Sequence, residues 1–167
     1  ACAFAKAGFN VVCVDPLLPA TNSDDINADL RSTAFLQPAK NTLEKTGVWE
    51  NFKKYSTPLE VMRLADAGGI ENEIRTVADF NSSEISDQPF AWNLPNWLLK
   101  RELIKHINSL PNIKLLFGQK IGRITTRTSE NLVIVGNEQY SCKLLIGADG
   151  RNSSTRQEMK IPVKTWR

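Results

Sequence analysis

Several features are scarce in this sequence of 167 residues, and each scarcity excludes a class of protein. No apolar run approaches the roughly 20 residues that a membrane-spanning helix needs, because the most continuous runs are Val11–Val14 and Leu144–Ala148. The residues from Ala1 to Lys6 do not show the basic and then apolar pattern of a secretory signal. A surplus of one charge is also lacking, since 21 basic and 18 acidic residues give a net charge of +3. This balance does not favour nucleic acid or an anionic membrane as a partner.

Residue types that bind metals are scarce as well. The sequence contains one histidine, His106, and three cysteines, Cys2, Cys13 and Cys142, which stand far apart and form no CxxC pair. An odd number of cysteines at this spacing fits neither a zinc site nor a disulfide framework. We therefore expect no metal site and three reduced thiols in a cytoplasmic protein. His106 is expected on the polar side of a helix, and we assign it no role.

What remains is an ordinary globular composition, with 41% hydrophobic and 23% charged residues. Helices alternate with strands at first, and a run of short strands follows, so the pattern predicts a mixed α/β fold with a β-rich insertion. Helices are expected over Ala1–Ala7, from Gln37 to a stop at Gly47, and over Asn96–Ser109, whereas Leu17–Asp29 and Asn81–Pro89 read as polar loops. Strands are expected over Phe9–Val14, Leu59–Leu64, Glu73–Phe80, Lys114–Phe117, Ile121–Thr128, Leu132–Val135 and Tyr140–Ile146.

The first 16 residues have the pattern of half a dinucleotide-binding unit. A helix ends at Gly8, an apolar strand follows, and Asp15 stands at the carboxyl end of that strand, where Pro16 stops it. In a βαβ dinucleotide-binding unit, the acidic residue at this place binds a ribose hydroxyl. A purely structural helix–strand–Asp arrangement has the same pattern and stays open at this point.

The strongest local signal is the segment Gly147–Arg156. An apolar strand is expected to lead into a Gly-Ala-Asp-Gly turn, which is followed by Ser153 and Arg156. Glycines allow a backbone to approach a ligand closely, and the Asp149 carboxylate accepts hydrogen bonds from hydroxyl groups. A tight turn capped by Asp149, without any ligand, explains the spacing equally well.

With its neighbours, this segment becomes recognisable. Gly-Ala-Asp-Gly-x-x-Ser-x-x-Arg at 147–156 resembles the second flavin motif of class A flavoprotein monooxygenases. Other segments resemble the same family in the same order along nearly the whole chain. They are Ala3–Val11 (the end of the first Rossmann helix), Asp29–Ala34 and Leu43–Trp49 with Pro58 (both typical of the ubiquinone-biosynthesis hydroxylases), and Asn96–Leu103 (a helix that begins with a flavin-contacting residue).

The resemblance implies a Rossmann-like FAD-binding fold over residues 1–55 and 96–167, with a β-rich substrate-side region over 56–95. It implies seven cofactor-binding residues and no identified catalytic residue. By this resemblance, Asp15 would bind the adenosine ribose, Arg31 would lie near the phosphate and ribityl side of the flavin, and Asn96 would contact the cofactor. Asp149 would bind the ribityl or pyrophosphate region, and Gly147 and Gly150 would let the backbone approach the cofactor there. Arg156 would either lie near a nicotinamide cofactor or pair with a neighbouring strand.

The implied function is an FAD-dependent hydroxylase that uses NAD(P)H or another donor and dioxygen to hydroxylate a polyprenylated phenol of ubiquinone biosynthesis. No nucleic acid is expected. The enzyme would be cytoplasmic, and peripheral contact with the membrane or with other proteins of the pathway stays open. The family's Gly-x-Gly-x-x-Gly loop before Ala1 and its third flavin motif are both missing, so we expect an internal piece of a longer enzyme, inactive by itself. Two alternatives stay open: another flavoenzyme on this scaffold, such as a halogenase or prenyl reductase, or a non-catalytic remnant.

Overall fold

The chain folds into two compact units and has mixed α/β structure, as the sequence predicts. The computed structural model describes residues 1–71 and 73–166. The first unit comprises residues 1–10 and 19–112, and the second comprises residues 11–18 and the chain from residue 113 on. Each unit has its own hydrophobic core.

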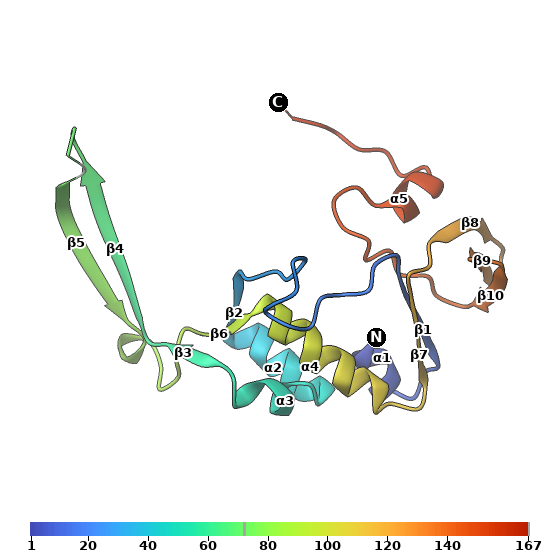
Figure 1. Ribbon diagram of the computed structural model, residues 1–167, viewed down its shortest axis with the longest axis horizontal. Coiled ribbons are helices and arrows are strands. Elements are labelled where there is room, and N and C mark those ends of the chain that lie inside the picture. The colour runs from blue at the N-terminus through green and yellow to red at the C-terminus, as the bar shows by residue number, and fades with distance from the viewer. Residues whose placement is uncertain (72, 167) are drawn as a thin grey trace. The chain divides into compact units, whose positions relative to one another are not determined.

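A short antiparallel sheet with helices packed near it forms the centre of the first unit. The sheet has the order β2 (Ser32–Leu36), β6 (Ala91–Pro95) and β3 (Thr57–Leu59). The helices are α1 (Cys2–Lys6), α2 (Gln37–Thr46), α3 (Trp49–Lys53) and α4 (Asn96–Asn108). Figure 1 shows β6 running directly into α4. Because β6 pairs with β2, this connection brings Asn96 beside the chain just before β2.

The core of the first unit explains one of the segments that carry the family resemblance. Gly47 ends α2 in the left-handed conformation, with φ 79°, which glycine adopts without strain. The next residues, Val48 and Trp49, are buried together with Phe52 of α3. The apolar stripe predicted for α4 packs against this cluster, through Leu99, Leu103, Ile107 and Leu110. The Gly47–Trp49 segment therefore serves packing.

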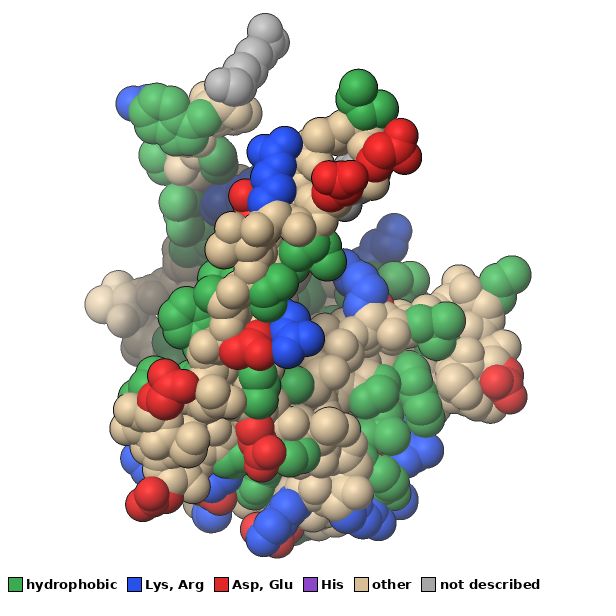
Figure 2. Space-filling model, turned by 90° about the vertical axis from the view of Figure 1, so that its left-hand side faces the viewer, with side chains coloured by type: hydrophobic (Ala, Val, Ile, Leu, Met, Phe, Trp, Pro, Cys, Tyr) green, Lys and Arg blue, Asp and Glu red, His purple; other side chains and the backbone are tan. Residues whose placement is uncertain are grey.

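A long hairpin of β4 (Val61–Gly68) and β5 (Glu73–Asn81) extends from the first unit (Figure 1). Arg63 and Asp79 face each other across it and form two hydrogen bonds of 2.7 Å. Large apolar side chains are exposed on the hairpin, and Figure 2 shows apolar and charged groups mixed on this side of the molecule. They are Val61, Met62, Leu64, Ile70, Ile74, Val77 and Phe80. A 3₁₀ turn, η1 (Ser82–Glu84), follows the hairpin.

The second unit contains two small sheets and one short helix. β1 (Val11–Asp15) pairs in parallel with β7 (Ile113–Phe117), and β8 (Ile121–Thr126), β9 (Asn131–Val135) and β10 (Glu138–Cys142) form an antiparallel meander. The helix is α5 (Ser154–Glu158). The predicted strand of the first 16 residues is thus confirmed, and Asp15 is its last residue.

The strand predicted over Tyr140–Ile146 is wrong in its second half. β10 ends at Cys142, and residues 143–146 are irregular. Leu144 and Ile146 are 63% and 55% exposed, so the Gly-Ala-Asp-Gly turn is not delivered by a buried strand. The reason is pairing: β9 accompanies β10 only as far as Cys142, and no strand of the described residues continues alongside.

Other differences concern short elements. The predicted strand Leu59–Leu64 is divided at Glu60 between β3 and β4. β2, β6, α3 and α5 were not predicted from the sequence. His106 does not lie on an exposed polar face: it is half-buried, and its Nδ1 lies 3.0 Å from Nδ2 of Asn51.

The predicted boundaries at residues 55 and 95 separate cofactor-binding regions from a substrate-side region. They stay a prediction.

Within the described residues, no helix is long and apolar enough to cross a bilayer. That part of the chain also contains no cluster of three or more His, Cys, Asp or Glu side chains that could hold a metal ion. Cys2 is buried, and Cys13 and Cys142 are half-buried.

Candidate functional site

The predicted cofactor residues fall into two groups, one in each unit. Arg31 and Asn96 belong to the first unit, and Asp15, Gly147, Asp149, Gly150 and Arg156 belong to the second.

Arg31 and Asn96 are brought together by Asp29, a residue that was not among the predicted cofactor-binding residues. The Asp29 carboxylate accepts hydrogen bonds from Nε and Nη2 of Arg31, both at 2.9 Å, and from Nδ2 of Asn96 at 3.0 Å. The Arg31 guanidinium beside it holds the pKa of the Asp29 carboxyl well below its usual value, and the Asn96 amide adds to this effect. The signal for Asp29 was present, since it opens the Asp29–Ala34 segment.

Asp15 stands at the carboxyl end of β1, as predicted. Its Oδ1 accepts a hydrogen bond of 2.9 Å from the backbone N–H of Leu17, which forms a local turn. Among the described residues, its Oδ2 has no hydrogen-bond partner, and the residue is exposed. One carboxylate oxygen therefore stays available for a ligand hydroxyl. No hydrogen bond or ion pair in the described chain connects Asp15 with the other predicted residues.

Asp149 has several partners inside the protein. Its carboxylate accepts hydrogen bonds from the Ser153 hydroxyl, from the Ser154 hydroxyl at 3.1 Å and from the backbone N–H of Thr155 at 2.9 Å. These bonds, that from Ser153 first, hold the pKa of the Asp149 carboxyl well below its usual value. Ser153 in turn caps α5 by accepting from the N–H of Arg156. The capped turn that the sequence left open is present.

The two glycines of this turn have different reasons to be glycine. A Cβ at Gly147 would lie 3.1 Å from Cγ2 and 3.2 Å from Cβ of Thr155, so this position is needed for close packing against α5. Gly150 has φ 82°, and a Cβ built there meets nothing within 4 Å. An exposed backbone with open space beside it fits the close approach of a ligand at Gly150.

Arg156 is turned back onto its own segment. Its Nη1 donates a hydrogen bond of 2.9 Å to the carbonyl oxygen of Arg151, and its Nε is buried without a partner. This contact holds the loop before α5 together. The structure shows no pairing of Arg156 with a neighbouring strand among the described residues.

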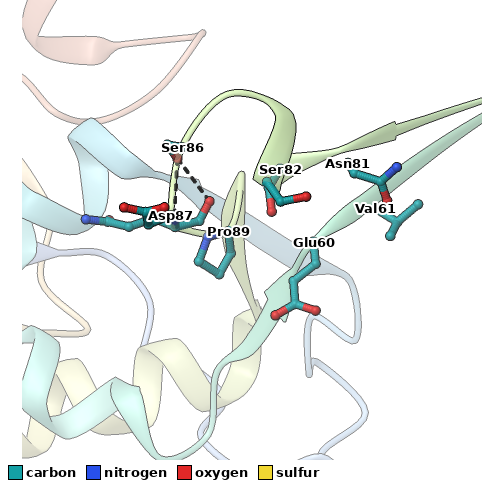
Figure 3. A pocket seen from close by; sticks show the side chains of 9 residues that line it. Glu60, Val61, Asn81, Ser82, Ser86, Asp87 and Pro89 are labelled. Carbon is teal, nitrogen blue, oxygen red and sulfur yellow. Dashed lines mark hydrogen bonds between the residues drawn. The ribbon is translucent and has the colours of Figure 1, made fainter.

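A recess of about 360 Å³ in the first unit lies where the hairpin meets the loop after it (Figure 3). Polar, acidic and apolar residues line it together: Glu60, Val61, Asn81, Ser82, Ser83, Ser86, Asp87, Gln88 and Pro89. None of the seven predicted residues lines it. In the second unit, a recess of about 280 Å³ lies between β8 and α5 and includes Ser154 and Thr155.

The model of one known protein family, described as FAD binding domain, matches residues 1–167 of this chain. The chain is 27% identical over 165 residues to the 3-demethoxyubiquinol 3-hydroxylase of Escherichia coli, covering 97% of this chain and 40% of that protein. It is 24% identical over 171 residues to a ubiquinone hydroxylase of Rhodospirillum rubrum, covering 99% of this chain and 37% of that protein. The chain thus spans well under half the length of these relatives.

Solved structures share the fold. The p-nitrophenol 4-monooxygenase of Pseudomonas putida superposes with a TM-score of 0.74 at 19% identity, over 95% of this chain and 39% of that one. A flavin-dependent monooxygenase in complex with FAD and substrate gives a TM-score of 0.75 at 15% identity, over 98% of this chain and 30% of that one. The mixed α/β fold is therefore the fold of FAD-dependent monooxygenases over part of their length, and the chain belongs to the FAD binding domain family.

Proposed function

We propose that this chain is the flavin-binding part of an FAD-dependent hydroxylase that acts on a polyprenylated phenol in ubiquinone biosynthesis. The observation that carries the proposal is the combination of the family match over residues 1–167 with the open Gly150 turn of the second unit. The assignment to ubiquinone biosynthesis is supported by two relatives of that activity, each aligned with almost the whole chain.

The available groups fit the chemistry of FAD. The free Oδ2 of Asp15 is an acceptor for a ribose hydroxyl. The Gly150 turn leaves room beside an exposed backbone, and Arg31 presents a guanidinium on a side chain that is 84% exposed. Guanidinium groups bind phosphate with charge-assisted hydrogen bonds. When bound, FAD would supply the redox chemistry, with NAD(P)H as electron donor and dioxygen as oxygen source.

The proposed assignment of regions to cofactor and substrate follows the family resemblance. Residues 1–55 and 96–167 would hold the cofactor, and residues 56–95 would lie on the substrate side. The exposed apolar side chains of β4 and β5 suit a region that faces an apolar substrate. We place the enzyme in the cytoplasm, in peripheral contact with the membrane that holds such substrates.

Flavin binding is tested with two matched glycine variants. Gly150→Ala and Gly118→Ala each introduce a Cβ at a left-handed glycine with open space around it, with φ 82° and 71°. Backbone strain is therefore similar, and Gly150→Ala should weaken FAD binding by roughly tenfold or more, whereas Gly118→Ala should leave the Kd unchanged. The Kd is measured by quenching of FAD fluorescence in the whole enzyme of which the chain is proposed to be a part, because the chain by itself is expected to bind FAD poorly. Equal Kd values for the two variants, or no FAD binding by the unmutated whole enzyme, would refute the proposal.

The substrate class needs a second assay. Because the chain by itself is expected to be inactive, the whole enzyme of which it is proposed to be the flavin-binding part is incubated with FAD, NADH or NADPH, dioxygen and a short-chain demethoxyubiquinol, and the product is examined by mass spectrometry. Addition of one oxygen atom is expected. FAD binding without hydroxylation would instead favour another flavoenzyme on the same scaffold, and incorporation of chloride or saturation of a prenyl double bond would identify which one.

A further inference from the structure

Asn96 is the first residue of α4, and both ends of its side chain are engaged within the protein. Its Oδ1 accepts a hydrogen bond of 2.6 Å from the Thr33 hydroxyl, and its Nδ2 donates one of 3.0 Å to Oδ2 of Asp29. Its backbone N–H donates to the carbonyl oxygen of Arg31 at 2.8 Å. A side-chain amide held at both ends has a fixed orientation, and here that orientation is toward Asp29.

Asp29 in turn fixes the orientation of the Arg31 side chain. Its two carboxylate oxygens accept from Nε and Nη2 of Arg31 in the parallel geometry that fits a guanidinium, and Oδ1 also accepts from the Arg31 backbone N–H at 3.2 Å. The Asp29 side chain is 21% exposed and the Arg31 side chain is 84% exposed. The Asp29 side of the pair is therefore mostly shielded from solvent, and the Arg31 guanidinium side lies in solvent.

Arg31 keeps donors for a ligand. A guanidinium has five N–H groups, of which two are directed at Asp29, so three remain on the outward side. A free arginine on the surface would lose conformational freedom on binding a ligand, whereas one already fixed by Asp29 would lose less. Fixing Asp29 is thus a way to strengthen binding at Arg31 without any direct contact.

We propose that Asn96 is a positioning residue, which acts through Asp29 to hold the Arg31 guanidinium ready for the phosphate groups of a bound ligand, and that its own side chain does not contact that ligand. The proposal rests on the proposed function in one respect, namely that the ligand is FAD. It replaces the expectation that Asn96 touches the cofactor directly.

A double-mutant cycle distinguishes positioning of Arg31 by Asn96 from direct contact between Asn96 and FAD. Asn96→Leu keeps the size of the side chain and removes both hydrogen bonds, Arg31→Gln removes the guanidinium, and Asn93→Leu on the neighbouring β6 is the matched control. FAD dissociation constants are measured in the whole enzyme of which this chain is proposed to be a part, for each variant and for the Asn96→Leu/Arg31→Gln double variant. We expect Asn96→Leu to weaken FAD binding roughly three- to tenfold in the unmutated background and to have no effect once Arg31 is replaced. The same loss in both backgrounds would mean direct contact by Asn96 and would overturn the proposal.

Riboflavin, which lacks phosphate, is the second probe. Its affinity should be the same with and without Asn96→Leu, because the proposed effect passes through a phosphate contact. A loss for riboflavin equal to the loss for FAD would contradict the proposal.

A third measurement needs no ligand. In the ligand-free protein, NMR follows the pKa of the Asp29 carboxyl and the hydrogen exchange of Arg31 Nε–H. Asn96→Leu should raise this pKa toward its usual value and speed the exchange, whereas Asn93→Leu should change neither. An unchanged pKa and exchange rate would refute the positioning role. If the unmutated whole enzyme bound no FAD, the proposed function would fail, and this measurement would decide the positioning role separately.

Discussion

Replacing Gly147 by alanine tests whether the Gly-Ala-Asp-Gly turn is shaped first by packing against α5. The new Cβ would lie 3.1 Å from Cγ2 of Thr155, whereas carbon atoms in good contact lie about 3.5–4.0 Å apart. The turn or α5 must therefore move by about 0.4 Å or more. Crowding of a packed site costs about 1–3 kcal/mol, and because Gly147 is exposed and its turn is able to yield, we expect about 1 kcal/mol.

Native-state hydrogen exchange measures this effect locally. The Thr155 N–H is bonded to the Asp149 carboxylate, so movement of α5 weakens this bond, and a loss of about 1 kcal/mol speeds its exchange about fivefold. Thr155→Ser removes Cγ2 and keeps the hydroxyl, so the Gly147→Ala/Thr155→Ser variant should exchange more slowly than additivity predicts. Strictly additive effects, or an unchanged Thr155 exchange rate in Gly147→Ala, would refute the packing argument.

Three further predictions concern stability. Phe52→Ala should lower the free energy of unfolding by about 3–5 kcal/mol in a denaturant titration, because Phe52 is fully buried, whereas Phe4→Ala, at a residue 38% exposed, should lower it by about 1 kcal/mol or less. Gly47→Ala should lower it by about 1 kcal/mol, since alanine is strained at φ 79°. The pKa of Asp149 is lowered on folding, so its contribution is complete above the usual carboxyl pKa of 3.8 and is lost as the pH falls below that value. Thermal unfolding between pH 2 and 6 should therefore show a shallower acid dependence for Asp149→Asn.

The elements that the sequence predicted well are those with a strong local signal. α2 has proline at its start and glycine at its end, and α4 has an apolar stripe over three turns, so their patterns require no knowledge of distant residues. β2 and β6 were missed because what stabilises them is their mutual pairing, Ser32 with Pro95 through Leu36 with Ala91, which no short window contains. The residues 143–146 were overpredicted for the converse reason: an apolar run has strand propensity, but a strand also needs a paired neighbour.

The candidate site shows the same limit. The family resemblance, and not the spacing alone, indicated Asn96 and Asp149 as cofactor-binding residues. It did not show how their hydrogen-bonding capacity is used, because their partners Thr33, Ser153 and Thr155 are found only once the chain is folded.

The predicted cofactor-binding residues therefore fall into two groups: those whose polar groups or space are taken up by protein partners, and those with groups still available to a ligand. Asn96 and Asp149 are held by protein partners on both sides, and Gly147 is packed against Thr155. Asp15, Arg31 and Gly150 keep an unbound carboxylate oxygen, outward guanidinium N–H groups and an open backbone, respectively. Ligand contact requires unsatisfied groups at an accessible surface, whereas groups satisfied internally fix the geometry of that surface. We therefore expect substitutions at the three open positions to alter flavin affinity directly, and substitutions at the three held positions to alter it only together with the local structure.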